Sequence, residues 1–156
     1  MAAAARTVTM WRHIPNVANG LTLQGGLELL LALVILVGGK DSDARAAESL
    51  YETALLAVGP PLLFMGGGLK ALAASRNRRF VGRRLGLAAL WSALPTALVW
   101  SCAPTGFALL AYGTVVYRNA RSREAFALGE SGKTPAEVRA ALDTGEREGP
   151  SPAHER

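Results

Sequence analysis

Three polar side chains, Gln24, Glu28 and Lys70, stand inside apolar stretches of the sequence and are the residues best placed for chemistry. Gln24 and Glu28 are four residues apart, so an α-helix carries both on one face. A carboxylate deep in an apolar segment costs about 3 kcal/mol on insertion scales unless it is paired, protonated or beside water. The three residues are therefore candidates for a polar pathway through the protein or for a polar contact inside it.

Lys70 is the partner that we expect for Glu28. If the apolar segments around these two residues cross a bilayer one after the other, they run in opposite directions, and Lys70 comes to the depth of Glu28. Two uses of Glu28 follow from this placement. It either forms a structural contact, by pairing with Lys70 or bonding a neighbouring helix, or it serves a proton, an ion or a ligand.

The elements that must position these residues are apolar helices. The chain has 156 residues, 50% of them hydrophobic, with a mean hydropathy of +0.21 and several long runs without charge, which is the composition of a membrane protein. We expect an all-α, polytopic membrane domain over residues 20–117, with spans at about 21–38, 54–73, 85–100 and 105–117. The last two segments are short for two crossings of about 20 residues each, so they are expected to form a short hairpin.

Charge asymmetry predicts the orientation of these spans. The segment Lys70–Arg84 carries six positive charges and no acid, whereas Gly39–Thr53 carries two positive and four negative charges. Because cytoplasmic loops are rich in Lys and Arg, we expect a protein of the inner (plasma) membrane with both termini in the cytoplasm. Five arginines of the basic segment are expected to contact anionic lipid headgroups: Arg76, Arg78, Arg79, Arg83 and Arg84.

The second predicted span has two unusual features. Pro60 and Pro61, which follow Gly59, remove two backbone donors in succession, and this predicts a kink or a break in the helix. The Gly66-Gly67-Gly68 run leaves a surface without side chains, against which another helix can pack closely. A broken helix that offers carbonyl groups to an ion is the alternative use of this segment.

The two ends are expected to be cytoplasmic. Residues 1–19 form a leader before the first span, and the length of that span favours a retained helix over a cleaved signal peptide. Residues 118–144 form a helical tail in which the first helix continues to about Leu128 and stops at Gly129. A second helix starts with a capping box between Thr134 and Glu137 and ends near Leu142, and residues 145–156 are expected to be disordered.

Several classes of function are disfavoured by the sequence. It has no Ser/His/Asp set and no cluster of metal ligands, and the acidic residues Asp41, Asp43 and Glu48 do not match a calcium loop. Its single cysteine, Cys102, excludes an intrachain disulfide. The positive charges sit beside apolar runs instead of forming a separate basic face. We therefore expect no catalytic residue, metal, cofactor or nucleic-acid partner.

Three classes of function remain. The favoured one is a non-catalytic subunit, or an accessory or assembly factor, of a larger membrane complex, because the chain is small and rich in small-residue packing faces. The alternative is a homo-oligomeric channel or proton- or ion-conducting protein that uses Gln24 and Glu28. An enzyme acting on lipids is the third. The expected partners are the bilayer with its anionic headgroups and other membrane chains or copies of this one.

Overall fold

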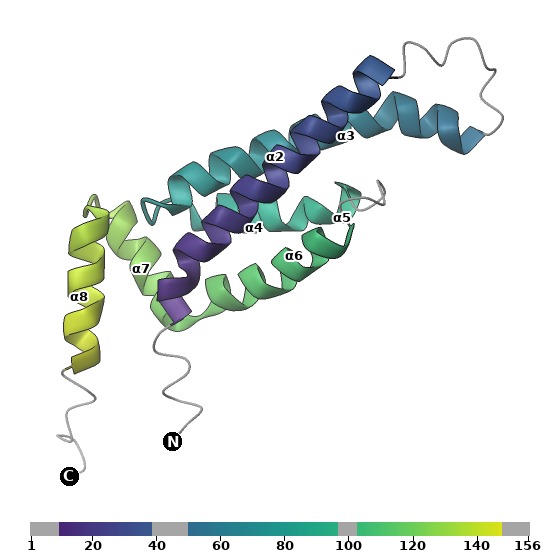
Figure 1. Cartoon of the computed structure of the whole chain (residues 1–156). Helices are drawn as coiled ribbons and strands as arrows, with labels where there is room; N and C mark the ends of the chain where they lie inside the picture. Colours follow the sequence, from purple (N-terminus) through teal and green to yellow (C-terminus); the bar gives the residue numbers. More distant parts are fainter. Residues whose placement is uncertain (1–9, 39–49, 97–102, 148–156) are drawn as a thin grey trace.

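A computed structural model describes residues 10–38, 50–96 and 103–147, and this part of the chain is helical and contains no strand (Figure 1). The predicted all-α class is thus confirmed. Asp41, Asp43 and Glu48, Cys102 and the last nine residues lie outside the described part. The elements, in order, are a 3₁₀ helix η1 (Met10–His13) and the α-helices α2 (Ile14–Gly38), α3 (Leu50–Asn77), α4 (Arg83–Trp91), α5 (Ala93–Thr96), α6 (Ala103–Arg118), α7 (Ala120–Glu130) and α8 (Pro135–Arg147).

Helices α2 and α3 form the long axis of the molecule. They pack side by side along their lengths, and α4, α5 and α6 cover one part of this pair (Figure 1). The α2–α3 pair reaches past the other helices toward the 39–49 connection, while η1, α7 and α8 gather at the opposite end. The polar and basic segments of the chain are thereby collected at one end of an apolar bundle.

Two of the described helices, α2 and α3, have the length and apolar composition of a membrane span. At 1.5 Å per residue their 25 and 28 residues extend roughly 37 and 42 Å, against about 30 Å for the hydrocarbon core of a bilayer. The other two predicted spans correspond to shorter pieces. The chain is interrupted at Ser92 between α4 and α5, and the 16 residues of α6 reach only roughly 24 Å. The described structure therefore contains two candidate spans, not four.

Of the predicted kink or break at Pro60 and Pro61, the break is wrong, because α3 continues through both prolines. Pro60 and Gly59 are buried in the bundle. Packing of α3 along α2 holds the segment in a helical conformation despite the missing backbone donors, as tertiary contacts often do against local propensity.

The tail differs from the prediction at both of its helices. Helix α6, which was expected to continue to about Leu128, stops at Arg118. The side chain of Asn119 accepts a hydrogen bond from the backbone N–H of Arg121 and so caps a new helix, α7. Gly129 lies inside α7, and Gly132, with a φ of 92°, makes the turn after it. Helix α8 runs on to Arg147 rather than ending near Leu142.

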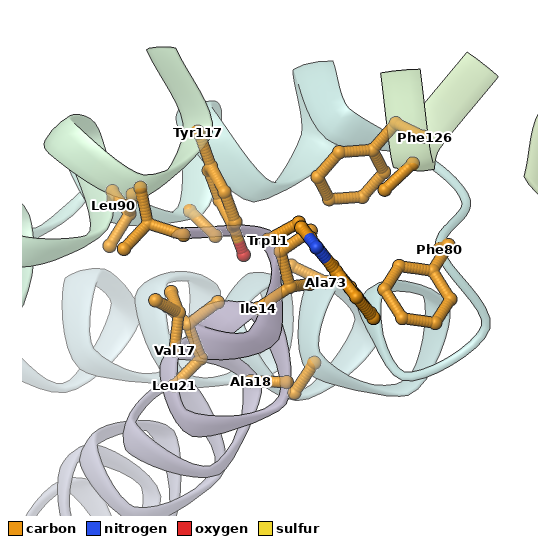
Figure 2. Close-up of a cluster of buried hydrophobic side chains, with 14 of the residues drawn as sticks. Trp11, Ile14, Val17, Ala18, Leu21, Ala73, Phe80, Leu90, Tyr117 and Phe126 are labelled. Carbon is orange, nitrogen blue, oxygen red and sulfur yellow. The ribbon is translucent and has the colours of Figure 1, made fainter. Parts of the chain in front are cut away.

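A cluster of buried apolar side chains joins the tail to the bundle (Figure 2). Trp11 of η1 lies between residues of α2, the turn after α3 and α7, and the rings of Tyr117 and Phe126 meet edge to face with centroids 5.5 Å apart. Val138 and Leu142 bring the apolar side of α8 into the same cluster. At the surface, Arg12 forms a 2.6 Å ion pair with Asp143, so η1 and α8 are also linked by charge.

The turn between α3 and α4 is fixed by Phe80. This residue has a φ of 55°, a left-handed conformation that is uncommon for a bulky side chain, and its ring is fully buried. Its backbone lies against Gly129, where an added Cβ would meet the Phe80 carbonyl oxygen at 2.3 Å. The absence of a side chain at position 129 therefore allows α7 to sit directly on the basic turn.

Of the three consecutive glycines in α3, Gly67 makes the closest approach to α2. A Cβ at Gly67 would lie 2.8 Å from the carbonyl oxygen of Gly25, and a Cβ at Gly25 would lie 2.8 Å from that of Gly67. Gly68 has open space beside it. Of the three glycines predicted to allow close packing, Gly67 is thus the one that lies against the backbone of α2. Its contact residue, Gly25, was not predicted.

Adjacent substitutions test this contact. We expect Gly67→Ala to lower the free energy of unfolding by about 1–3 kcal/mol, because the new methyl group must push α2 away from α3. Gly68→Ala should be neutral or stabilising by up to about 1 kcal/mol, since it gains helix propensity without a clash. Thermal unfolding of both variants in the same detergent gives the comparison, and equal losses would argue against the close approach.

The start of α8 supplies a second prediction. The backbone N–H of Thr134 donates to the Glu137 carboxylate at 2.7 Å, and this bond, with that from the Thr134 hydroxyl, holds the pKa of Glu137 below its ordinary value. The predicted capping box is therefore present. Because the pKa of Glu137 is lowered in the folded state, its ionised carboxylate stabilises the fold at pH values above the ordinary pKa of a carboxyl group. This stabilisation is lost as the pH falls through the lowered pKa.

Amide protection factors in the first turn of α8 should therefore fall on acidification, and Glu137→Ala should lower them already at neutral pH. Glu124→Ala, which removes an exposed partner of Arg121 in α7, serves as the control and should leave α8 unchanged. If the amide protection factors in α8 change neither with pH nor in the Glu137→Ala variant, packing of Val138 and Leu142 alone determines them.

Candidate functional site

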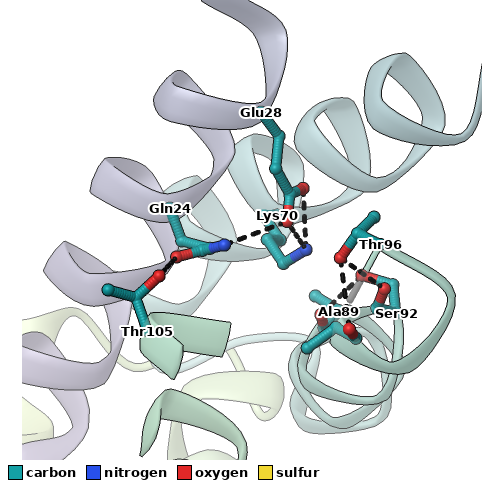
Figure 3. Close-up of polar contacts among 8 residues, drawn as sticks. Gln24, Glu28, Lys70, Ala89, Ser92, Thr96 and Thr105 are labelled. Carbon is teal, nitrogen blue, oxygen red and sulfur yellow. Dashed lines mark hydrogen bonds and ion pairs between the residues drawn. The ribbon is translucent and has the colours of Figure 1, made fainter. Parts of the chain in front are cut away.

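The strongest polar feature of the described structure is an ion pair between α2 and α3 (Figure 3). The Nζ atom of Lys70 donates to both carboxylate oxygens of Glu28, at 2.6 and 2.8 Å. The two side chains retain only 1% and 0% of their exposure. The contact expected from the antiparallel order of the apolar segments is present, and it brings together residues 42 positions apart.

Gln24 extends this pair into a network that reaches α6. Its amide nitrogen donates to Glu28 Oε1 at 3.1 Å, and its carbonyl oxygen accepts a 2.7 Å hydrogen bond from the hydroxyl of Thr105 (Figure 3). Gln24 thus uses one end of its amide for each neighbour, which fixes its orientation. The network connects three helices through four side chains.

Gly66 provides the space that the ion pair occupies. A Cβ at this position would lie 3.0 Å from Glu28 Oε2 and 2.8 Å from the Cγ2 atom of Thr96 in α5. Any larger residue would therefore press on the carboxylate or on α5. Gly66 therefore leaves room for the network, and it also contributes to the lining of a groove on the outer side of α3.

The chemistry open to this arrangement is narrow. Both oxygens of Glu28 accept from Lys70, and one accepts from Gln24 as well, so the carboxylate is held by charge-assisted hydrogen bonds. A buried acid and base in direct contact can hold helices in register, whereas conduction needs a carboxylate that water or an ion can reach. Within residues 10–38, 50–96 and 103–147, no three His, Cys, Asp or Glu side chains are placed to share a metal ion.

The arginines of the basic segment divide into two groups. Arg83 donates from Nε to the backbone carbonyl of Tyr117, and Arg78 donates to the side chains of Asn19 and Thr22. These two side chains therefore tie the turn to α6 and α2. Arg76, Arg79 and Arg84 are exposed, and their side chains have no hydrogen-bond or ion-pair partner in the part of the chain that the structure describes.

An apolar groove of about 550 Å³ lies on the outer side of α3, between this helix and the α4–α5 region. It is lined by large apolar side chains and two glycines of α3, and by three residues of the Ser92–Thr96 stretch. The full lining consists of Leu62, Phe64, Met65, Gly66, Gly68, Leu69, Leu72, Ser92, Pro95 and Thr96. Gly68 contacts no other helix closely and lines this groove, so a side chain at position 68 would point into open space there.

Three of these features were not predicted from the sequence. Thr105 is one of four hydroxyl-bearing residues in the apolar segment 105–117, and nothing in the sequence marks it as the partner of Gln24. Gly25 stands next to Gln24, and its lack of a side chain is a signal for close packing that could have been used. The groove depends on how α3, α4 and α5 diverge, which residue spacing alone does not determine.

Comparisons with known proteins add no assignment: no family model, no curated protein and no solved structure matches this chain.

Breaking the buried pair should be far more costly than breaking a surface pair. We expect Glu28→Gln and Lys70→Met each to lower the free energy of unfolding by about 3–5 kcal/mol, because each leaves one charge buried without its partner. The double variant should recover a large part of the loss, which a double-mutant cycle measures directly. Glu124→Gln, at an exposed pair with Arg121, is the matched control and should cost less than about 1 kcal/mol. Strictly additive losses would contradict a direct pairing.

Proposed function

We propose that the protein is a non-catalytic integral membrane protein that acts as a subunit, or as an accessory or assembly factor, of a larger membrane complex. In this proposal it resides in the inner (plasma) membrane, with its N-terminal segment, its basic turn and its helical tail on the cytoplasmic side. The short α4–α6 hairpin enters the bilayer beside α2 and α3 and completes a four-segment membrane domain.

Polar side chains between the helices, together with apolar side chains on the outer surface, support the membrane location. The side chains buried between the helices include Gln24, Glu28 and Lys70, while large apolar side chains are exposed along α2 and α3. Only 28% of the most apolar stretch of α2 is buried, which differs from the mostly buried core helix of a water-soluble protein. The exposed apolar side chains include Leu23, Leu27, Leu30, Leu33, Val34, Val37, Val58, Phe64, Met65, Leu72, Trp91, Phe107 and Val115.

The contacts of α2 support a retained first span. A helix removed as a signal peptide would take Glu28 with it and leave Lys70 buried without a counter-charge. It would also remove Trp11 and Ile14 from the cluster that joins the bundle to the tail. The positive charges of the α3–α4 turn and the tail lie at the same end as η1, which agrees with the cytoplasmic side predicted from charge.

One observation favours a subunit over a channel, namely that Glu28 is enclosed and fully paired. A conducting carboxylate must face water or an ion path, and this one faces a lysine inside its own chain. The surfaces left for association are the apolar outer sides of α2 and α3, most of all where this pair extends beyond the shorter helices (Figure 1). Helices of another membrane chain can pack on such surfaces.

The test is the native mass of the protein extracted from its membrane in mild detergent, with identification of the chains that accompany it. We expect a defined complex that contains different chains. Glu28→Gln should reduce the amount of that complex, because the bundle that offers the docking surface is destabilised. A homo-oligomer that assembles normally with Glu28→Gln but loses ion flux in vesicles would instead establish the channel. Glu124→Gln controls for the change of charge.

A further inference from the structure

Three exposed arginines lie in and beside the α3–α4 turn, which follows the end of the groove at Leu72. Arg76 is in the last turn of α3, Arg79 is in the connecting turn, and Arg84 is in the first turn of α4. All three are exposed and lack a partner for their side chains within the described residues, unlike Arg78 and Arg83, which bond to the protein. The protein thus holds a set of free guanidinium groups where the two helices that border the groove come together.

Helix geometry places Arg76 in line with the groove. Met65, Leu69, Leu72 and Arg76 follow one another at spacings of four, three and four residues, so they share one face of α3. The first three of these residues line the groove, and Arg76 follows one turn beyond them. Arg79 and Arg84 come next in the chain, in the turn and at the start of α4.

The dimensions match one leaflet of a bilayer. The α3 wall of the groove runs from Leu62 to Leu72, a rise of roughly 15 Å, and Arg76 lies roughly 6 Å further on. Half of a hydrocarbon core is also about 15 Å thick. The groove therefore spans the depth of an acyl chain, and the arginines lie at the level of the headgroups. Its volume of about 550 Å³ is in the range of small-molecule sites.

We propose that this groove binds one anionic phospholipid of the cytoplasmic leaflet, with the phosphate held by Arg76, Arg79 and Arg84 and an acyl chain lying over Gly66 and Gly68. The proposal rests on the membrane location proposed above. Guanidinium groups bind phosphate oxygens through paired hydrogen bonds, and the apolar walls select a hydrocarbon chain. The three arginines favour an anionic lipid over an apolar helix of another protein, because an apolar helix would leave these charges without a counter-ion.

The bound chain also has a structural consequence. Gly66 lines the groove and at the same time lies against Glu28 Oε2, with no side chain between them. An acyl chain in the groove covers this thin place from outside.

The experiment uses the full chain reconstituted in vesicles of equal parts phosphatidylglycerol and phosphatidylcholine, extracted in mild detergent and weighed by native mass spectrometry. The wild-type protein should retain one phosphatidylglycerol per chain. Replacing the three arginines together, Arg76→Gln, Arg79→Gln and Arg84→Gln, should lower the preference for phosphatidylglycerol over phosphatidylcholine at least tenfold. Gly68→Leu should lower retention of both lipids, because its side chain fills the groove without a clash in the bundle.

Matched controls use the same kinds of change elsewhere. Arg118→Gln, Arg123→Gln and Arg139→Gln remove three exposed arginines near the same end but away from the groove, and Gly26→Leu adds the same side chain in open space on α2. Both controls should retain phosphatidylglycerol as the wild type does. Helical content from circular dichroism verifies the fold of every variant.

Three outcomes would overturn the lipid site. The two sets of arginine variants could lose phosphatidylglycerol equally, or the arginine and Gly68→Leu variants could retain it as the wild type does. In the third, no lipid is retained and an accompanying protein covers the groove. Extraction of the membranes with alkaline carbonate separates this from the proposed function. Release of the protein into the soluble fraction would refute the membrane location itself, whereas an intact membrane complex without a retained lipid would refute only the site.

Discussion

The structure depends most on the contact between Glu28 and Lys70. Because both side chains are removed from solvent, a shift of α2 against α3 by even one turn would leave two buried charges apart. The pair thus fixes the register of the two long helices, although its net contribution to stability over an apolar pair of equal volume need not be large. Two neighbouring residues suit this pair. The glycine at position 66 leaves room for the Glu28 carboxylate, and the Gln24 amide donates a further hydrogen bond to that carboxylate.

The glycines show how small residues divide the work along a single helix. Gly66, Gly67 and Gly68 point in three directions, toward the ion pair, toward the backbone of α2 and toward the outer groove. A helix advances 100° per residue, so three consecutive positions face three different neighbours. The same local sequence therefore serves the polar interior, the helix contact and the surface, and substitution at each position has a different physical consequence.

Much of the fold follows from hydropathy and charge, while the finer geometry does not. Within the described residues the apolar segments are helical, with an interruption at Ser92 in the third, and the order of Glu28 and Lys70 in antiparallel segments was enough to predict their contact. The continuity of α3 at Pro60 and the break at Asn119 depend on packing that a local rule does not include. Thr105 could not be assigned to the polar network because its importance comes only from the position of α6 beside α2. Residue type alone likewise does not determine how deeply α4, α5 and α6 enter a bilayer.

The meeting of η1 and α8 has a consequence for the biogenesis of the protein. Arg12 and Asp143 are 131 residues apart, and Trp11 is buried in the cluster that also contains Leu142. At a synthesis rate of about 5–20 residues per second, roughly 7–26 s separate the appearance of these two partners on the ribosome. During that interval the indole of Trp11 has no cover from α8, and the ring of Phe80 joins it about half-way through. Closure of this end is therefore a late event of folding, and a nascent chain released early would present an aromatic surface to cellular quality control.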